Sequence, residues 1–387
     1  MESWNYIVFA DHRFAKEADE ELQKLFPAAH IGERAARDGQ FFMARMDGDK
    51  KGILSAIKAG RPSFVDAVIP IDAELGGADK DYGNVIRSMA GLLDKRSTFK
   101  IEVKRMDPTL RERAKSIEVR LGSALEAEGF RADLKNPKTV AYVILMAGKT
   151  LIGTIGREQV ENYVLDRFRL GQKETGKVNR AEFKLEEAVE FFGVDLSKVR
   201  RALDIGAAPG GWTHYLATHR VRVVAIDNAL LDYEKLCQAG KLLVVADRKE
   251  LSPIENMLRD CGAAFADIDD ARIRFDGYAV IHIKMNLKSV KKELLDRLGE
   301  FGLLTIDTNT EASTSAGIAD SLACMLDPDA HLIMTVKLVR SNTAKQVAAA
   351  EAGISGSYDR PEIKKLPHNR DELTLHARKR SRSNKNA

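Results

Sequence analysis

Apolar and polar positions along the first part of the chain follow a pattern that predicts short strands separated by helices. Apolar runs that end at a charged or turn-forming residue predict strands near residues 6–10, 41–46 and 64–71. Between the first two runs, apolar residues recur at the spacing of one helical face, at Phe14, Ala18, Leu22 and Leu25. The pattern therefore predicts a small α+β domain of the ferredoxin-like type over residues 1–75.

A second α+β region is predicted over residues 76–158. Its expected elements are a half-buried strand at 99–104, a helix at 110–125 and two strands at 139–145 and 149–156. The last of these strands is expected to pair back on the one before it. An Asn136-Pro137 turn precedes the pair.

From residue 179 to residue 380 the strands are predicted to be continuously apolar and to alternate with helices. Such a pattern is typical of a doubly wound, mostly parallel sheet, so the fold class of this domain is α/β. Residues 159–178 are basic and glycine-punctuated and are predicted to be a linker. Residues 381–387 are predicted to be a basic tail.

The most informative stretch is 201–213, Arg-Ala-Leu-Asp-Ile-Gly-Ala-Ala-Pro-Gly-Gly-Trp-Thr. A buried strand is predicted to end at Ile205, and three glycines and a proline follow within six residues. A turn of this composition lets the backbone approach a ligand closely before a helix begins near Trp212. The next predicted strand ends in Asp227, near the distance at which an acidic residue meets ribose hydroxyls in nucleotide-binding βαβ units. The turn alone also fits other α/β proteins.

Residues 204–212 resemble the cofactor loop of the FtsJ-like RNA ribose methyltransferases, D-x-G-x-x-P-G-G-W. The resemblance implies a Rossmann-like class I methyltransferase domain at 179–380 and S-adenosylmethionine as cofactor. A further motif of that family, S-R-A-x-x-K-L, resembles residues 179–185, although Asn179 stands where the family has serine. The implied cofactor-binding residues are Asn179, Gly206, Pro209, Gly210, Gly211, Trp212, Asp227, Asp247 and Asp307.

The same resemblance implies a catalytic tetrad of Lys184, Asp307, Lys337 and Glu372. Lys284 also lies in a predicted strand and competes with Lys337, but the segment from His368 resembles the ending of the bacterial large-subunit rRNA cytidine ribose methyltransferases, which favours Lys337. Residues 250–300 exceed what the core of this family needs and contain an extra strand-like run at 278–284.

The chemistry expected of the tetrad is methyl transfer to a ribose 2′-hydroxyl. That hydroxyl is a poor nucleophile and needs a base within hydrogen-bond range, for which a lysine requires a lowered pKa. Burial and the neighbouring Lys184 are expected to lower the pKa of Lys337. Asp307 and Glu372 are expected to orient the ammonium groups and the hydroxyl. Two alternatives stay open: an RNA base methyltransferase, and a catalytically decayed RNA-binding assembly factor.

Composition narrows the expected partners and location. The 387 residues carry a formal net charge of only +4, which neither demands nor excludes nucleic acid. Three distant cysteines and no clustered ligands predict neither disulfides nor a metal site, so a cytoplasmic location is expected. No apolar run is long enough to span a membrane.

Residues 76–158 resemble the THUMP domain in their order of elements and in a Leu-x-Asn-Pro turn at 134–137. This resemblance implies contact with structured RNA, either rRNA or tRNA. Basic side chains of the region suited to phosphate contacts are Lys100, Lys104, Arg105, Arg111, Arg113, Lys135 and Lys138. An ordinary solvated face explains them equally well.

Overall fold

The computed structural model describes residues 5–34, 41–76, 82–107, 109–156, 177–270, 274–338 and 343–381. It divides into two compact units, Met1–Arg169 and Leu170–Ala387. Almost all of the predicted linker at 159–178 and of the predicted tail at 381–387 lies outside the described residues. Within the described residues, no helix combines the length and the apolar character that crossing a membrane requires.

The first sheet of the N-terminal unit is antiparallel, with the strand order β2-β3-β1-β4. Its elements are β1 (Tyr6–Ala10), α1 (Ala15–Leu25), β2 (His30–Arg34), β3 (Phe41–Arg45), α2 (Lys50–Gly60) and β4 (Val65–Pro70). This is the ferredoxin-like arrangement, as predicted. Strand β2 was not predicted, because His-Ile-Gly-Glu-Arg contains a single apolar side chain.

The second sheet of this unit has the order β5-β9-β8-β6-β7. Its elements are β5 (Ala73–Gly76), α3 (Gly83–Leu92), β6 (Thr98–Arg105), α4 (Ala114–Ala127), β7 (Arg131–Ala132), β8 (Thr139–Met146) and β9 (Lys149–Gly156). The predicted pairing of the last two strands is confirmed, since Thr139 lies opposite Gly156 and Met146 opposite Lys149. The division at residue 75 stays a prediction, and β5 pairs with β9 rather than with the first sheet.

The C-terminal unit is built on a nine-stranded sheet, β13-β12-β14-β11-β10-β15-β16-β18-β17, parallel except where β18 pairs with β16 and β17. Its strands are β10 (Arg201–Ile205), β11 (Arg222–Asp227), β12 (Leu242–Ala246), β13 (Ala264–Asp267), β14 (Val280–Lys284), β15 (Phe301–Ile306), β16 (Leu326–Lys337), β17 (Glu362–Lys364) and β18 (Glu372–Arg378). The predicted α/β class with a mostly parallel sheet is confirmed.

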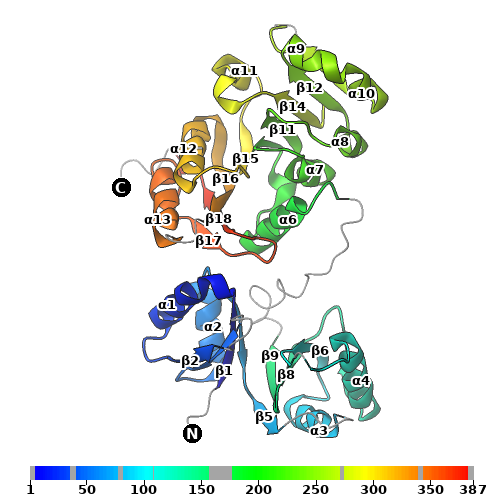
Figure 1. Ribbon diagram of the computed structural model, residues 1–387, viewed down its shortest axis with the longest axis vertical. Helices are drawn as coiled ribbons and strands as arrows, with labels where there is room; N and C mark the ends of the chain where they lie inside the picture. The colour runs from blue at the N-terminus through cyan, green and yellow to red at the C-terminus, as the bar shows by residue number, and fades with distance from the viewer. Residues whose placement is uncertain are drawn as a thin grey trace. The chain divides into compact units, whose positions relative to one another are not determined.

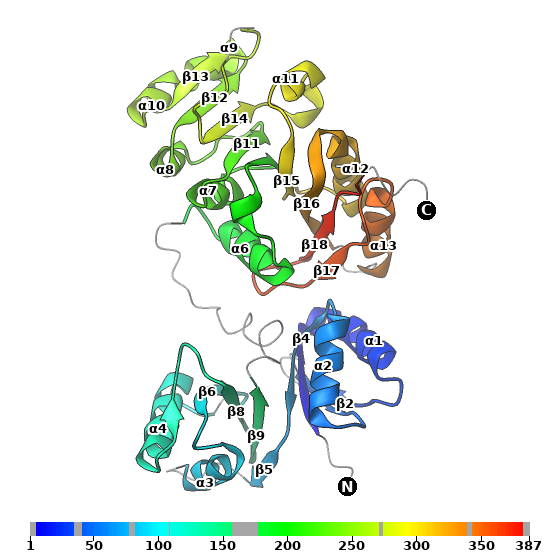
Figure 2. The same ribbon diagram turned by 180° about the vertical axis from the view of Figure 1, so that it is seen from behind.

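Helices cover both faces of this sheet (Figures 1 and 2). The helices are α6 (Ala181–Phe192), α7 (Gly211–Thr218), α8 (Tyr233–Ala239), α9 (Arg248–Leu251), α10 (Glu255–Asp260), α11 (Lys292–Asp296), α12 (Ala312–Leu322) and α13 (Thr343–Ile354). Helices α6 and α7 lie on one face, where Leu185, Trp212 and Leu216 pack with Val223 and Leu303 of the sheet in one buried core. Helices α12 and α13 lie on the other face (Figure 2).

The strand-like run predicted at 278–284 is β14, and it is an integral strand rather than a surface insertion. It pairs in parallel with β11 on one side and β12 on the other. Its buried residues Ile281 and Ile283 meet those of its neighbours, with Ile283 opposite both Ile226 and Val245. The extra length at 250–300 therefore widens the sheet between β11 and β12.

Candidate active site

The glycine turn joins β10 to α7 and lies against the end of the neighbouring strand β15. Gly206 has a φ of +74°, and a Cβ added there would lie 2.9 Å from the carbonyl oxygen of Asp307 and 2.8 Å from Cγ2 of Thr308. Only glycine adopts this conformation and tolerates this contact without strain. The backbone N–H of Asp307 in turn donates to the carbonyl of Ile205, at 3.1 Å. The turn and the predicted catalytic aspartate are thereby held side by side.

Helix α6 is anchored to the same turn by its first residues. The indole Nε1 of Trp212 donates to the carbonyl oxygen of Ala181 at 2.7 Å, and Oδ1 of Asn179 accepts from the backbone N–H of Ala181 at 2.9 Å. A Cβ added to Gly211 would lie 2.3 Å from that Oδ1 atom, so the close approach requires glycine. Asn179, Gly211 and Trp212, all predicted cofactor residues, therefore also position the helix that carries Lys184.

The other side of α6 is tied to the loop before β18. The carboxylate of Glu187 accepts from the backbone N–H of His368 at 3.0 Å and lies 2.6 Å from its Nδ1 atom. The ring of Phe183 stacks on that of His368, with 4.7 Å between ring centres. Phe183 and Glu187 lie on either side of Lys184 in α6, and His368 lies four residues before Glu372. These contacts therefore fix the helix that carries Lys184 against the segment that carries Glu372.

Lys184, Asp307, Lys337 and Glu372 meet in a closed ring of alternating charge, which we call the charge ring. Nζ of Lys184 lies 3.2 Å from Oδ2 of Asp307 and 2.7 Å from Oε1 of Glu372. Nζ of Lys337 lies 3.5 Å from Oδ1 of Asp307 and 2.5 Å from Oε2 of Glu372. Only 7% of the Glu372 side chain is exposed. Charges withdrawn from water to this extent require close partners of opposite sign, which each member has.

Strand register explains how the ring closes. Lys337 is the last residue of β16 and lies directly opposite Glu372, the first residue of the antiparallel strand β18. Asp307 follows the end of β15, which runs parallel to β16. The hydroxyl of Thr335, two residues before Lys337, donates to Oδ1 of Asp307 at 3.0 Å. Thr335 was not predicted as a site residue, although the alternation of faces along a strand places it on the side of Lys337.

The pKa of Lys337 is raised, so the expectation of a lowered pKa is wrong. Burial of the amine lowers its pKa, but the charges of Asp307 and Glu372 and their hydrogen bonds to the amine raise it by more in total. Burial raises the pKa of Glu372, yet Lys184 and Lys337 together lower it to about 2. At neutral pH Glu372 is therefore a carboxylate and Lys337 an ammonium. The predicted pKa took account of the charge of Lys184 but not of the charges of the two acids.

Asp204 is the first residue of the D-x-G-x-x-P-G-G-W motif, and its carboxyl group is buried and has a structural role. It accepts hydrogen bonds from the hydroxyls of Thr213 at 2.6 Å and Thr305 at 2.8 Å. Burial raises its pKa to about 7, although these hydrogen bonds lower it. Asp204 thus links β10, α7 and β15 beneath the glycine turn.

The remaining predicted cofactor residues lie at the carboxyl ends of other strands. Asp227 accepts from the backbone N–H groups of Ala208 at 3.0 Å and Ala229 at 2.8 Å, which leaves lone pairs for a further donor. Pro209 and Gly210 complete the turn, and the carbonyl of Pro209 accepts from the N–H of Asp232. Asp247 is exposed at the end of β12, and β14 separates this strand from β11.

Lys284, the competing lysine, ends β14 and forms an ion pair with Glu250. Strands β11 and β10 lie between β14 and β15, so Lys284 is outside the charge ring. Across the described residues, no group of three or more His, Cys, Asp or Glu side chains is placed to hold a metal ion.

A cavity of about 440 Å³ opens beside the charge ring. Lys337 forms part of its wall, together with Asn309 and Thr310 from the segment after β15 and Lys345 and Gln346 from α13. Ligand cavities in proteins commonly have 300–1,000 Å³. Its hydrogen-bonding side chains and its contact with Lys337 make it the candidate entrance for a substrate.

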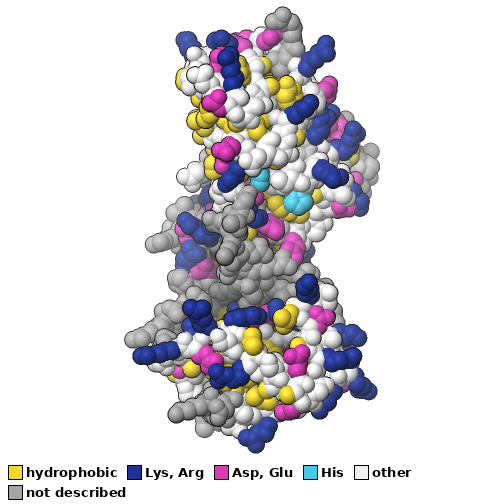
Figure 3. Space-filling model, turned by 90° about the vertical axis from the view of Figure 1, so that its right-hand side faces the viewer, with side chains coloured by type: hydrophobic (Ala, Val, Ile, Leu, Met, Phe, Trp, Pro, Cys, Tyr) yellow, Lys and Arg dark blue, Asp and Glu magenta, His cyan; other side chains and the backbone are white. Residues whose placement is uncertain are grey.

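Some of the basic residues predicted for RNA contact in the N-terminal unit already pair with groups of the same unit. Lys100 lies 2.5 Å from Glu102, and Arg105 donates to the carbonyl oxygens of Leu110 and Glu112. Arg111 and Arg113 are exposed. Figure 3 shows Lys and Arg side chains on this unit interspersed with Asp and Glu. RNA contact by this unit stays a prediction.

The sheet order, the glycine turn after β10 and an acidic residue at the end of β11 define a Rossmann-like class I methyltransferase domain. Residues 177–315 match the family model described as FtsJ-like methyltransferase. This part of the chain is therefore an FtsJ-like methyltransferase domain. FtsJ-like and other class I methyltransferases use S-adenosylmethionine.

Among the curated relatives that match the chain are two large-subunit ribosomal RNA methyltransferases. One is ribosomal RNA large subunit methyltransferase E of Acidiphilium cryptum, 40% identical over 104 residues, 27% of this chain and 44% of the relative. The other is ribosomal RNA large subunit methyltransferase M of Cellvibrio japonicus, 30% identical over 203 residues, 47% of this chain and 57% of the relative. The chain thus spans about half the length of these relatives. A solved structure, TrmN from Thermus thermophilus, aligns over 97% of this chain and 99% of its own, with 14% identity and a TM-score of 0.34.

Proposed function

We propose that this protein transfers the methyl group of S-adenosylmethionine to a ribose 2′-hydroxyl of structured RNA. The observation that carries the proposal is the closed charge ring of Lys184, Asp307, Lys337 and Glu372 beside the glycine turn. An isolated buried ion pair would be weak support, because such pairs also occur as structural features. Four charges gathered at the edge of the sheet where β15 and β16 end, next to a nucleotide-type turn, are suited to catalysis.

Ribosomal RNA is the substrate class that we propose, because the relatives from Acidiphilium cryptum and Cellvibrio japonicus are named as large-subunit rRNA methyltransferases. Transfer RNA is the alternative. The cavity of about 440 Å³ beside Lys337 is large enough to admit a nucleotide next to the charge ring.

The fit of the chain to S-adenosylmethionine rests on two features of the site. The turn at 206–211 brings backbone close to a ligand, and Asp227 has lone pairs left for ribose hydroxyls. When bound, this cofactor supplies an electrophilic methyl group on a positively charged sulfur. The protein's task is then to align the hydroxyl and remove its proton.

In the proposed mechanism the Lys337 amine takes the proton of the ribose hydroxyl as the methyl group is transferred. Its raised pKa means that this amine must first lose a proton. A positive sulfonium nearby would help, because a like charge lowers the pKa of an amine. Lys184 and Asp307 hold the ring together while Glu372, bonded to both lysines, fixes the direction of the Lys337 amine.

The test is transfer of tritium from methyl-labelled S-adenosylmethionine to RNA from cells that lack this protein. We expect incorporation with the unsubstituted chain and a loss of at least about 100-fold with Lys337→Ala, the usual contribution of a general base. Lys198→Ala, which changes an exposed lysine of the same unit, is the matched control.

Nucleoside mass spectrometry of the labelled RNA then identifies the acceptor. A 2′-O-methyl nucleoside supports the proposal, whereas a base-methylated nucleoside would replace it with base methylation. Absence of incorporation into any RNA, with a folded protein, would favour a catalytically decayed RNA-binding factor. Full activity in Lys337→Ala would remove the assigned role of Lys337.

A further inference from the structure

A second cavity, of about 520 Å³, lies at the opposite edge of the same sheet from the glycine turn. Its floor is formed where β10 and β11 begin, at Arg201 and Arg222, which are the first residues of those strands. The segment before β14 and the end of α11 form its walls. Ligands of doubly wound sheets bind at the carboxyl ends of the strands, so this cavity is separate from the candidate active site.

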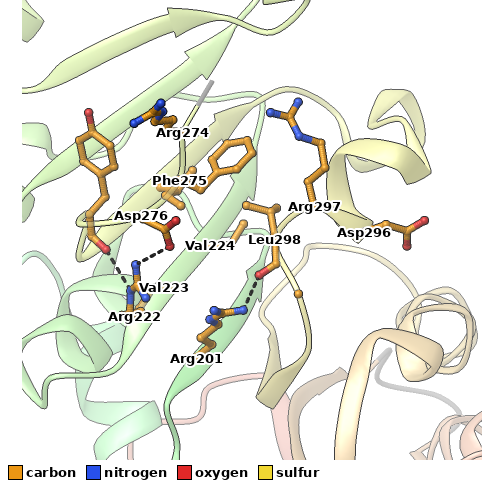
Figure 4. A pocket seen from close by; sticks show the side chains of 13 residues that line it. Arg201, Arg222, Val223, Val224, Arg274, Phe275, Asp276, Asp296, Arg297 and Leu298 are labelled. Carbon is orange, nitrogen blue, oxygen red and sulfur yellow. Dashed lines mark hydrogen bonds and ion pairs between the residues drawn. The ribbon is translucent and has the colours of Figure 1, made fainter. Parts of the chain in front are cut away.

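Arginine dominates the polar lining of this cavity, which we call the arginine cavity. Four arginines, Arg201, Arg222, Arg274 and Arg297, line it together with two aspartates, Asp276 and Asp296. Figure 4 shows Arg201 and Arg222 on one side of the space and Arg274, Phe275 and Arg297 on the other.

The ion pair that Asp276 makes with Arg222 is exposed and weak. Asp276 lies 3.8 Å from Arg222, and 98% of its side chain is exposed. Such a pair contributes little energy, so it is readily exchanged for another anion. Among the described residues, no hydrogen bond or ion pair of the Arg274 side chain is found, and Asp296 points away from the cavity in Figure 4.

Apolar and aromatic groups complete the lining. Val223, Val224 and Ile281 are buried beneath the arginines. The guanidinium group of Arg297 lies over the ring of Phe275, 5.2 Å from its centre. A nucleotide presents the matching chemistry, since its base has flat apolar faces and its phosphate accepts the paired N–H donors of a guanidinium.

We propose that the arginine cavity binds a nucleotide of the substrate RNA away from the methylated residue. This inference rests on the proposed function. Arg222, Arg274 and Arg297 all keep part of their side chains at the surface, which suits a phosphate that remains within an RNA chain. Arg201 donates to the carbonyl of Leu298 at 2.8 Å and Arg222 to the carbonyl of Tyr278 at 3.4 Å, so both also hold the walls of the cavity in place.

The separation of the arginine cavity from the cofactor-binding edge of the sheet follows from β11. Arg222 and Asp227 are the two ends of this strand, five residues apart, which corresponds to about 17 Å. The charge ring lies farther along the same edge as Asp227, beyond β10 at the ends of β15 and β16. Structured RNA extends over more than this length, so one RNA can place a ribose at the charge ring and a second nucleotide in the arginine cavity. The second contact would then strengthen RNA binding without touching the reacting atoms.

The test compares the full chain with a triple variant, Arg222→Gln, Arg274→Gln and Arg297→Gln, and with the control Arg259→Gln. Arg259 is a matched control, because it is exposed and also lies over a phenylalanine ring, Phe265, at 5.6 Å. Filter binding of in vitro transcribed large-subunit rRNA is measured at several salt concentrations. Methyl transfer to the same RNA gives kcat and KM.

Each phosphate contact contributes about 0.7 to the slope of log affinity against log salt. A nucleotide within an RNA chain has a phosphate on each side, so loss of both contacts should reduce the slope by about 1.4 and weaken binding roughly 25-fold at 0.1 M salt. We expect KM for RNA to rise by a similar factor while kcat at saturating RNA stays unchanged. Arg259→Gln should behave like the unsubstituted chain.

Three results would overturn the inference. Affinity and salt slope of the triple variant equal to those of Arg259→Gln would show that RNA does not use the cavity, and would leave the proposed function intact. Binding of free AMP that the triple variant loses, with unchanged RNA affinity, would make this a mononucleotide site. If the unsubstituted chain binds no RNA, the proposed function falls together with this inference.

Discussion

Replacing Glu372 with glutamine isolates the electrostatic role of the charge ring. Glu372 is bonded to Nζ of Lys184 at 2.7 Å and to Nζ of Lys337 at 2.5 Å, and 7% of its side chain is exposed. In Glu372→Gln the two lysines share only Asp307, so the Lys337 amine loses one of the two charges that raise its pKa. Glutamine keeps the shape and a hydrogen bond but removes the charge. The neutral amine should therefore form at lower pH than in the unsubstituted protein.

The expected magnitudes follow from this geometry. An opposite charge within hydrogen-bond range changes a pKa by at least about one unit, so the rising limb of kcat/KM against pH should move by at least about one pH unit toward acid. Removing one partner from a buried ion network costs up to about 3–5 kcal/mol of unfolding free energy. The plateau rate should also fall, because Glu372 no longer fixes the direction of the amine.

Two assays check this prediction: the pH dependence of methyl transfer and urea unfolding of the same preparation. Glu300→Gln, a change of an exposed glutamate in the same unit, is the control and should alter neither. If Glu372→Gln stays folded and its rising limb is not displaced, Lys337 is not the base. If the limb moves toward alkaline pH, the assigned sign of the Glu372 interaction is wrong.

Three further predictions concern the unsubstituted protein, Gly206 and Asp204. In the unsubstituted protein, kcat/KM should keep rising through the alkaline range, because the raised pKa of Lys337 keeps its amine protonated at neutral pH; a plateau already reached at pH 7 would contradict this. Gly206→Ala should weaken S-adenosylmethionine binding by at least about tenfold in calorimetry, since a Cβ would lie 2.9 Å from the carbonyl oxygen of Asp307 and a strained φ costs about 1–3 kcal/mol. The buried carboxyl of Asp204 has a pKa of about 7, so the folded state binds this proton more tightly than the unfolded chain, and its stability falls as pH rises from 4 through 7. That loss amounts to about 4 kcal/mol, and Asp204→Asn should abolish it in unfolding experiments between pH 4 and pH 8; an unchanged pH dependence would count against a buried ionisation there.

Local pattern was sufficient to predict where the strands of the C-terminal unit end. Apolar runs that stop at Asp204-Ile205, Ile306 and Lys337 predicted β10, β15 and the end of β16. Because parallel strands end at one edge of a sheet, their terminal residues had to lie near one another. The position of Glu372 could not be predicted from local pattern alone, because its contact with Lys337 depends on the register of the antiparallel pair β16–β18.

The sign of the Lys337 pKa could not be predicted for the same reason. The tetrad implied by the family resemblance suggested that Lys184 and Lys337 face each other, and like charges lower the pKa of an amine. The structure instead interposes a carboxylate on each side, with Glu372 and Asp307 each contacting both amines. Which effect wins depends on distances of a few ångströms, and these arise from tertiary packing.

The position of β14 has a consequence for the cofactor-binding edge of the sheet. Neighbouring strands lie about 4.8 Å apart, so the insertion of β14 puts Asp247 about 10 Å farther along the sheet than Asp227. A nucleoside held by its ribose at Asp227 therefore meets the end of β14 before it can meet Asp247. The predicted contact of Asp247 with an adenine amino group requires a ligand that reaches across Lys284, which lies opposite Asp227 at the end of β14, and Met285, whose backbone N–H donates to the carbonyl of Asp227. The added strand leaves the charge ring unchanged, because β10, β15, β16 and β18 remain neighbours. It does change which side chains lie next to a ribose bound at Asp227, because β14 rather than β12 is the neighbour of β11.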